Sequence, residues 1–194
     1  MREPDVDFIG RFLSSDYISL LSEKEASWDD EFWSKPQKTI AEELAVEYTR
    51  LFLGPKNHIP PYESLYNFKP GEAKQLWGSA TVEVKKIIEN SGLSLKKNYG
   101  GIPDHLGIEL EFMQKVVKKE AELWKRPKAY SRLLKTLEVE KKFIDDHLEK
   151  WVPEFCRKVK KIASLDFYIN FAELTAGFIF SEKKGVRKLI SFLT

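Results

Sequence analysis

The sequence predicts an all-α fold, a single-domain helical bundle of about six to eight helices over residues 1–194. Apolar residues recur every three or four positions along most of the chain, which is the period at which a helix buries one face. Convincing strand alternation is not found in the sequence. Internal repeats and linker-like segments are not found either, so the helices are expected to share one core.

The first helices are placed by their start and stop signals. Asp16 suits the N-cap of a short helix over 17–25. Pro36 suits the first turn of a longer helix that runs to Leu53, because its missing N–H would have no partner there in any case. The Gly-Pro pair after Leu53 is expected to end this helix.

Three further helices are expected in the middle of the chain. The first spans about 72–90 and ends before a Ser-Gly pair. The second begins with Asp104 as its N-cap and runs to about Trp124. The third is opened by Pro127 and carries an apolar face toward His147.

The C-terminal part predicts two more helices. Pro153 is expected to open a short one, and Asp166 to cap one over 166–180. Because 166–180 is apolar on nearly every side, it is expected to lie at the centre of the bundle. Asn170 and Glu173 interrupt it, so it is too polar to span a membrane and membrane insertion is not expected.

The charge distribution limits the classes of partner. The formal net charge is +2, which argues against a general nucleic-acid-binding protein. Residues 1–50 hold 12 Asp and Glu against 6 Lys and Arg, which leaves +8 for the remainder. An acidic patch on the N-terminal part is therefore expected, and it would suit a basic partner.

The cysteine content and the N-terminus indicate the compartment. Cys156 is the single cysteine, so an internal disulfide is impossible, which suits a reducing cytosol. Its apolar neighbours favour a buried, structural role. Residues 1–20 lack a basic segment followed by an apolar one, so no signal peptide is expected and a cytoplasmic location is predicted.

Motifs of common catalytic and cofactor sites are not found. The sequence lacks a Walker-type phosphate loop, a GxGxxG, a CxxC and an HExxH. A di-iron bundle needs Glu-x-x-His pairs, but Pro55, Ile102 and Ile144 stand three residues before the histidines. The sequence therefore predicts no catalytic residues, no metal ligands and no cofactor.

Two other segments carry unusual chemistry. Pro60 and Pro61 stiffen a loop that offers Tyr62 and Tyr66, and rigid aromatic side chains are favoured at binding surfaces. The alternative is a loop that simply covers the core. Trp77, which follows soon after, is the tryptophan most suggestive of binding.

The second segment is Pro103-Asp104-His105, with Glu109 one turn later. Carboxylates in this arrangement would suit a cationic group such as a guanidinium, which they pair with in a two-pronged geometry. The alternative is ordinary helix capping, because acidic residues near a helix start are favoured by the helix dipole.

Four blocks together resemble the TorD/DmsD/NarJ family of redox-enzyme maturation chaperones. They are "EYTRLFLGP" (47–55), "PPYESLY" (60–66), "PDHLGIELEFM" (103–113) and, as one block, "HLEKWVPEFCRKV" with "DFYINFAELTAGFI" (147–179). The resemblance covers about residues 40–180 in the same order. The family often has an acidic residue shortly before Pro-Asp-His, where this chain has Gly100, Gly101 and Ile102.

The resemblance implies an all-helical, non-catalytic chaperone of the cytoplasm. Such proteins bind the twin-arginine leader, and in some cases the apo body, of a molybdenum-cofactor (molybdopterin) oxidoreductase subunit, and hold it until the cofactor is inserted and the subunit is exported. They occur as monomers or domain-swapped dimers. The resemblance assigns peptide contact to Pro60, Pro61, Tyr62, Ser64, Tyr66, Pro103, Asp104 and His105. The physical argument adds Glu63, Trp77 and Glu109.

Two other functions stay open from the sequence. The first alternative is a nucleotide-binding protein, although the sequence lacks a phosphate cradle. The second is a helical adaptor that uses its acidic N-terminal part to bind a basic partner. Nucleotide-dependent stabilisation would favour the first, and strongly salt-dependent capture of a partner would favour the second.

Overall fold

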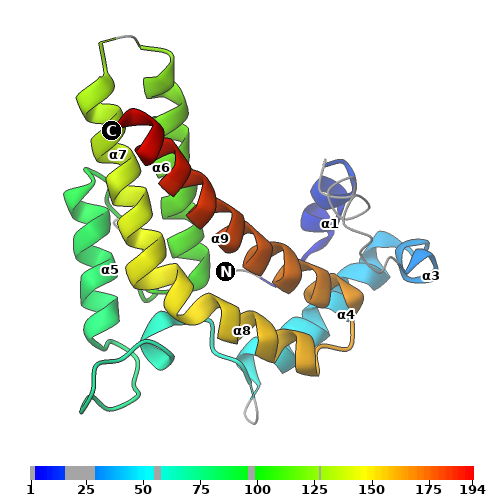
Figure 1. Ribbon diagram of the computed structural model, residues 1–194. Helices are drawn as coiled ribbons and strands as arrows, with labels where there is room; N and C mark the ends of the chain where they lie inside the picture. The colour runs from blue at the N-terminus through cyan, green and yellow to red at the C-terminus, as the bar shows by residue number, and fades with distance from the viewer. Residues whose placement is uncertain (1–2, 16–28, 55–57, 96–98, 127) are drawn as a thin grey trace. The chain divides into compact units, whose positions relative to one another are not determined.

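The computed structural model describes residues 3–15, 29–54, 58–95, 99–126 and 128–194. Within these residues the secondary structure is helical, which confirms the predicted all-α class (Figure 1). The only pairing of extended backbone in this part of the chain is an isolated antiparallel bridge between Tyr62 and His105. The expected helix over 17–25 and Pro127 lie outside the described residues.

The described chain divides by its internal packing into two compact units. One comprises residues 1–60 and 155–175, and the other residues 61–154 and 176–194. Two helices, α8 (Glu149–Ile162) and α9 (Asp166–Leu193), contribute residues to both.

The first unit contains the helices α1 (Val6–Leu13), α3 (Asp30–Trp33) and α4 (Gln37–Tyr48), and a π-helical turn, Thr49–Leu53. The Asp5 carboxylate caps α1 by accepting from the Phe8 N–H at 2.7 Å. Aromatic rings fill the space between α1, the end of α3 and the start of α9, and comprise Phe8, Phe12, Trp33, Phe167 and Phe171. The predicted helix 36–53 is confirmed, and its stripe Ile40, Leu44, Tyr48 and Leu51 is buried.

Glu47 joins α4 to the turn between α8 and α9. Its carboxylate forms an ion pair with Arg50 at 2.6 Å and accepts from the Ser164 N–H at 2.7 Å. Burial opposes ionisation, but the hydrogen bonds from Arg50 and Ser164 outweigh it and lower the pKa of Glu47. The ionised carboxylate therefore stabilises this unit.

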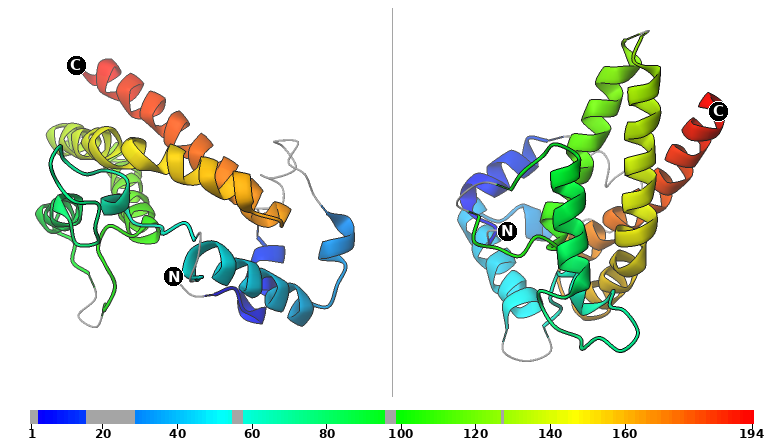
Figure 2. Two further views of the ribbon diagram at one scale, coloured as in Figure 1. Left: turned by 90° about the horizontal axis from the view of Figure 1, so that it is seen from below. Right: turned by 90° about the vertical axis from the view of Figure 1, so that its left-hand side faces the viewer.

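The second unit contains a 3₁₀ turn (Glu63–Leu65), the helices α5 (Ser79–Asn90), α6 (Leu106–Trp124) and α7 (Tyr130–Phe143), and a π-helical turn, Ile144–Leu148. Helices α5, α6 and α7 lie side by side in Figures 1 and 2. The rings of Phe112 and Phe143 pack edge to face, 4.7 Å apart, between α6 and α7. This contact packs α6 against α7.

Three predicted helix starts are wrong. The helix expected from residue 72 begins only at Ser79, because Trp77 has φ 66°, which an α-helix does not allow. Asp104 does not cap α6; the His105 side chain does, by accepting from the Gly107 N–H at 3.0 Å. Pro153 lies inside α8, shortly after the widened π turn, rather than opening a helix.

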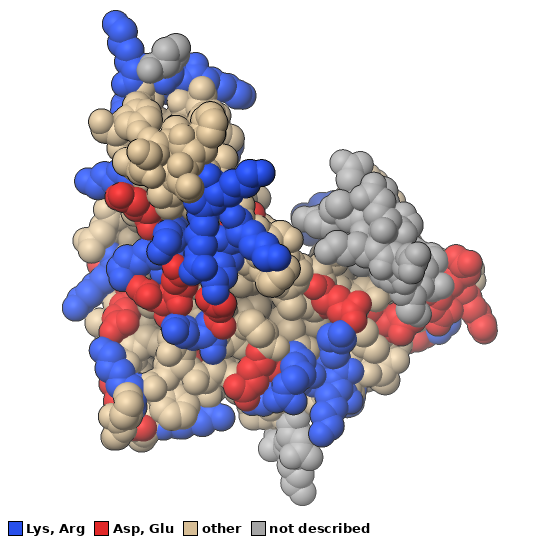
Figure 3. All heavy atoms as spheres, in the orientation of Figure 1, with Lys and Arg blue, Asp and Glu red and all other residues tan. Residues whose placement is uncertain are grey.

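Helix α9 differs from its expectation in length and burial. It continues past residue 180 to Leu193. Phe180 is 61% exposed and Phe192 is 81% exposed, so α9 is not buried on all sides. Figure 3 shows Lys and Arg side chains gathered over α7 and the C-terminal half of α9. Among the described helices, none combines the length and the hydropathy needed to cross a bilayer.

Candidate functional site

The structure brings the two unusual segments of the sequence together. The Glu63 N–H donates to the Asp104 carbonyl at 3.0 Å, and the Leu106 N–H donates to the Pro61 carbonyl at 2.9 Å. The rings of Tyr62 and His105 meet edge to face with their centroids 5.1 Å apart. The loop 61–66 is therefore fixed along the start of α6. Pro60 belongs to the first unit, while the other ten predicted site residues belong to the second.

Asp104 fastens the loop rather than the helix. Its Oδ2 accepts from the Ser64 N–H at 2.7 Å, and the residue is fully buried. His105 takes over the cap of α6 with Nδ1, which requires a neutral imidazole. Burial lowers the pKa of His105 to about 4, so the ring is neutral near neutral pH.

Glu63 fixes the loop 61–66 through contacts with His147 and Asn67. Its side chain is fully buried, and both carboxylate oxygens lie 3.0 Å from His147 Nδ1. Asn67 Nδ2 donates to Glu63 Oε1 at 2.6 Å and to the Asp146 carbonyl at 3.2 Å. The 3₁₀ turn of the loop is thereby tied to the π turn Ile144–Leu148.

Glu109 lies behind the same loop. It is fully buried, and its Oε2 accepts from Trp151 Nε1 at 3.0 Å. Burial, together with the nearby charge of Glu63, raises the pKa of Glu109 well above its usual value. The carboxyl group of Glu109 is therefore protonated more readily than that of an exposed glutamate. The Tyr66 ring covers the Trp151 ring at 5.4 Å.

Three buried polar atoms around this loop have no hydrogen-bond partner in the described chain. They are Ser64 Oγ, Asp104 Oδ1 and Glu109 Oε1. Buried polar atoms without partners are rare in native proteins. Spare acceptor capacity is therefore concentrated behind the loop.

The outer side of the site is aromatic and apolar. Tyr62 and Tyr66 are half-buried, while Pro61 and Pro103 are buried. Trp77 is 62% exposed, and the exposed Phe68 and Leu76 lie on the same irregular segment. A Cβ on Gly78 would approach Ser64 Cβ to 3.5 Å, which places the residue after Trp77 against the loop.

Sequence reasoning missed His147, Trp151 and Asn67. They lie in chain segments more than 80 residues away from the loop or just beyond its end, and their spacing gives no signal. The "HLEKW" segment, which includes His147 and Trp151, was noted only as part of a family-like block. In the folded chain His147 contacts Glu63 and Trp151 donates to Glu109.

Ligand sites for metals are not evident in the described chain. No group of three or more His, Cys, Asp or Glu among these residues has a metal-binding arrangement. Cys156 is buried, as predicted from its apolar neighbours. The chemistry of the site is therefore a rigid aromatic surface over buried acids.

Comparison with known proteins gives a consistent result. A family model described as "Nitrate reductase delta subunit" matches residues 17–157. Three similar curated proteins are each named "Chaperone protein TorD". The one from Vibrio parahaemolyticus is 28% identical over 137 residues, which cover 70% of this chain and 60% of that protein.

The relatives from Photobacterium profundum and Shewanella piezotolerans are 26% and 29% identical, over 73% and 72% of this chain. The matches cover 66% and 60% of those two proteins. This chain thus spans about three fifths to two thirds of the length of these relatives. The family match includes the loop 61–66 and the whole of α6.

Proposed function

Because the chain belongs to the nitrate reductase delta subunit family, we propose that it is a chaperone for the maturation of a molybdenum-cofactor oxidoreductase subunit. It binds that subunit in the cytoplasm and has no catalytic role of its own. The observation that carries this proposal is the fixed loop 61–66, which presents aromatic side chains over buried acids. A surface of this kind suits recognition of a peptide rather than turnover of a substrate.

The peptide that fits best is a twin-arginine leader. Such a leader joins a pair of arginines to an apolar segment. Tyr62, Tyr66 and Trp77 offer aromatic area for the apolar part. The loop is held by backbone and side-chain hydrogen bonds, so little entropy is lost when a peptide binds to it.

Three buried acidic residues lie in or next to the loop 61–66. Asp104, Glu63 and Glu109 are fully buried, so an arginine reaches their oxygens only if the loop moves. In the conformation seen here they hold the loop and keep a negative charge beneath it. That charge attracts the arginines, and Asp104 keeps one oxygen, Oδ1, without a hydrogen-bond partner in the described chain.

The proposal is tested by co-purification. The tagged chain is expressed with an oxidoreductase subunit encoded beside it that carries an Arg-Arg leader. Capture of that subunit, and its loss when the leader is deleted or when Tyr62→Ala is introduced, supports the proposal. Tyr130→Ala is the control, because Tyr130 is 50% exposed and lies away from the loop, on α7.

Two other results have clear meanings. Capture that survives leader deletion moves the contact to the body of the client, and no capture of any such subunit refutes the chaperone proposal. Light scattering on the purified chain distinguishes the monomer from the domain-swapped dimer that family resemblance allows. Fractionation of cells tests the cytoplasmic location.

A further inference from the structure

A groove in the second unit is separate from the loop 61–66 and has different chemistry. It consists of two neighbouring cavities, of about 530 Å³ and about 200 Å³. Both are lined by Leu93 and by Lys115, so they adjoin along α6. None of the eleven predicted peptide-contact residues lines either cavity.

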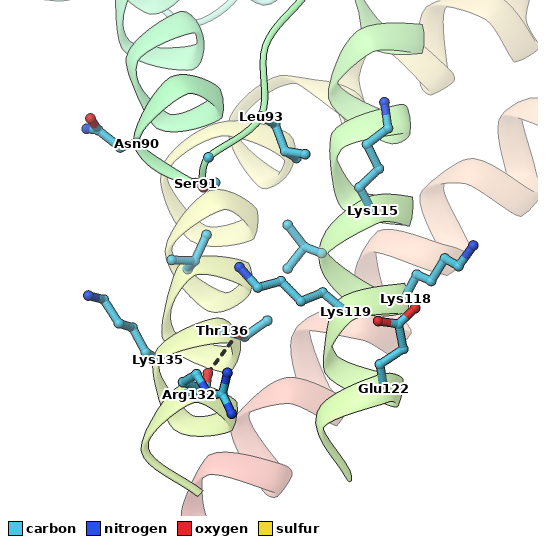
Figure 4. A pocket seen from close by; sticks show the side chains of 13 residues that line it. Asn90, Ser91, Leu93, Lys115, Lys118, Lys119, Glu122, Arg132, Lys135 and Thr136 are labelled. Atoms are coloured by element: carbon cyan, nitrogen blue, oxygen red, sulfur yellow. Dashed lines mark hydrogen bonds between the residues drawn. The ribbon is translucent and has the colours of Figure 1, made fainter. Parts of the chain in front are cut away.

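The larger cavity has a basic rim. Lys115, Lys118 and Lys119 project from α6, and Arg132 and Lys135 project from α7 (Figure 4). Lys119 extends across from α6 toward α7 in this view. Among the described residues that line this cavity, Glu122 is the one acidic residue.

Most of these cations are uncompensated. Lys115 pairs with Glu111, at the edge of the smaller cavity. Within the described chain, Lys118, Lys119, Arg132 and Lys135 form no ion pair. Cations gathered at a concave surface attract a negatively charged ligand.

The smaller cavity is largely apolar. It is lined by Ile88, Leu93, Leu95, Ile108 and Phe112 among others. Val116 and Val139 continue this apolar lining beneath the basic rim of the larger cavity. A matching ligand therefore carries an apolar group at one end and negative charges at the other.

A peptide fits this groove better than a nucleotide. Among the described lining residues, the aromatic rings of Tyr99 and Phe112 lie in the smaller cavity and none lies in the cavity that holds the cations, where a base next to bound phosphates would need one. The cations are spread over successive turns of two helices, which suits several separate carboxylates.

We propose that this groove binds an acidic segment of a partner protein, with an apolar side chain in the smaller cavity and carboxylates on the basic rim. The charge complementarity is that of the uncompensated Lys and Arg side chains with Asp and Glu. The inference does not depend on the proposed chaperone function, because the groove and the loop share no residue.

The test uses the full chain and labelled synthetic peptides. The first probe is a twelve-residue peptide with two leucines at one end and five Asp or Glu at the other. A second probe has serines in place of its leucines, and a third has lysines in place of its acids. Binding is measured by fluorescence anisotropy at low salt, with the protein in excess.

Matched triple variants assign the site. Lys119→Gln, Arg132→Gln and Lys135→Gln together are expected to weaken binding of the first probe about tenfold, because each exposed charge contact contributes modestly. The control triple is Lys86→Gln, Arg157→Gln and Lys161→Gln, which makes the same charge change at exposed positions outside the groove. Leu93→Ala is expected to weaken the first probe but not the serine probe.

Selective loss with the groove triple supports the proposal, as does weaker binding of the serine and lysine probes. Equal loss in both triples would show that only net charge matters, and it would overturn the groove assignment. Inorganic pyrophosphate is added as a competitor. If it stabilises the chain against heat through these cations while no acidic peptide binds, the ligand is a phosphate compound and the peptide proposal fails.

Discussion

Individual carboxyl groups hold the loop 61–66 in place. Asp104 accepts from the Ser64 N–H, and Glu63 reaches back to His147. Each group is buried, so each loses its solvation and needs these partners. These side-chain contacts of Asp104 and Glu63 therefore determine whether the aromatic surface of the loop is preorganised.

Asp104→Ala removes the acceptor of the buried Ser64 N–H. The free energy of unfolding is expected to fall by about 1–3 kcal/mol, because a buried donor is left without a partner. Asp104→Asn keeps one oxygen and should cost less. Urea denaturation measures both, and an unchanged Asp104→Ala protein would show that the loop is held by other contacts.

Trp77 combines exposure with a strained backbone. A tryptophan at φ 66° is rare, and glycine adopts this region without strain. Trp77→Gly is thus expected to leave stability unchanged or raise it by up to about 1 kcal/mol. The same change should weaken leader binding about tenfold if Trp77 contacts the peptide.

The control for Trp77 is Phe192→Ala, which removes another exposed ring. Thermal melting reports stability, and anisotropy with a labelled leader peptide reports binding. A marked loss of stability in Trp77→Gly would mean that the indole packs on the fold. Unchanged affinity in a stable variant would remove Trp77 from the proposed site.

At the scale of elements, α6, α7 and α9 meet through three glutamates. Glu140 on α7 lies near Glu120 on α6 and Glu182 on α9, and it is 1% exposed. Burial, together with hydrogen bonds to Glu182 and Glu120, raises the pKa of Glu140 to about 9. The protonated carboxyl joins these helices, and its ionisation would drive them apart.

This arrangement predicts a fall in stability with rising pH. Between about pH 4.5 and 9 the unfolded chain releases the Glu140 proton while the folded chain retains it, so unfolding becomes more favourable as pH rises. Glu140→Gln should flatten this fall and raise the free energy of unfolding at pH 8 by about 1–3 kcal/mol.

Urea denaturation from pH 5 to pH 9 checks this expectation. Glu138→Gln on the exposed face of the same helix is the control and should leave the slope unchanged. If wild type and Glu140→Gln show the same pH dependence, Glu140 ionises normally in the folded chain.

At the scale of the whole molecule, α8 and α9 each contribute residues to both compact units. A helix cannot unfold over half its length without exposing the apolar face of the remainder. If the chain is a single domain, as the sequence predicts, we expect both units to unfold together in one cooperative transition.

Two probes test this expectation. Circular dichroism follows all helices. In a variant in which Trp28 and Trp33 of the first unit are replaced by Phe, tryptophan fluorescence comes from Trp77, Trp124 and Trp151 and reports the second unit. Coincident curves in urea support a single cooperative domain. Separate midpoints would show that the two units unfold independently.

The sequence by itself determined the helical class, the main helix of the first unit and the two segments of the candidate site. These follow from local signals, since apolar period, Gly-Pro stops and proline stiffness act within a few residues of the chain. The same signals misplaced the starts at Asp104 and Pro153. Asp104 binds the distant loop at Ser64 instead of capping α6. Pro153 lies within α8 because a π-helical turn precedes it, so the helix continues through this residue.

Only the tertiary structure decided which groups meet. The contacts of Glu63 with His147 and of Glu109 with Trp151 join residues 84 and 42 positions apart. No local pattern encodes them, because long-range packing selects partners by shape and burial. The basic groove arises in the same way, since its cations come from two helices and its apolar lining from a third as well.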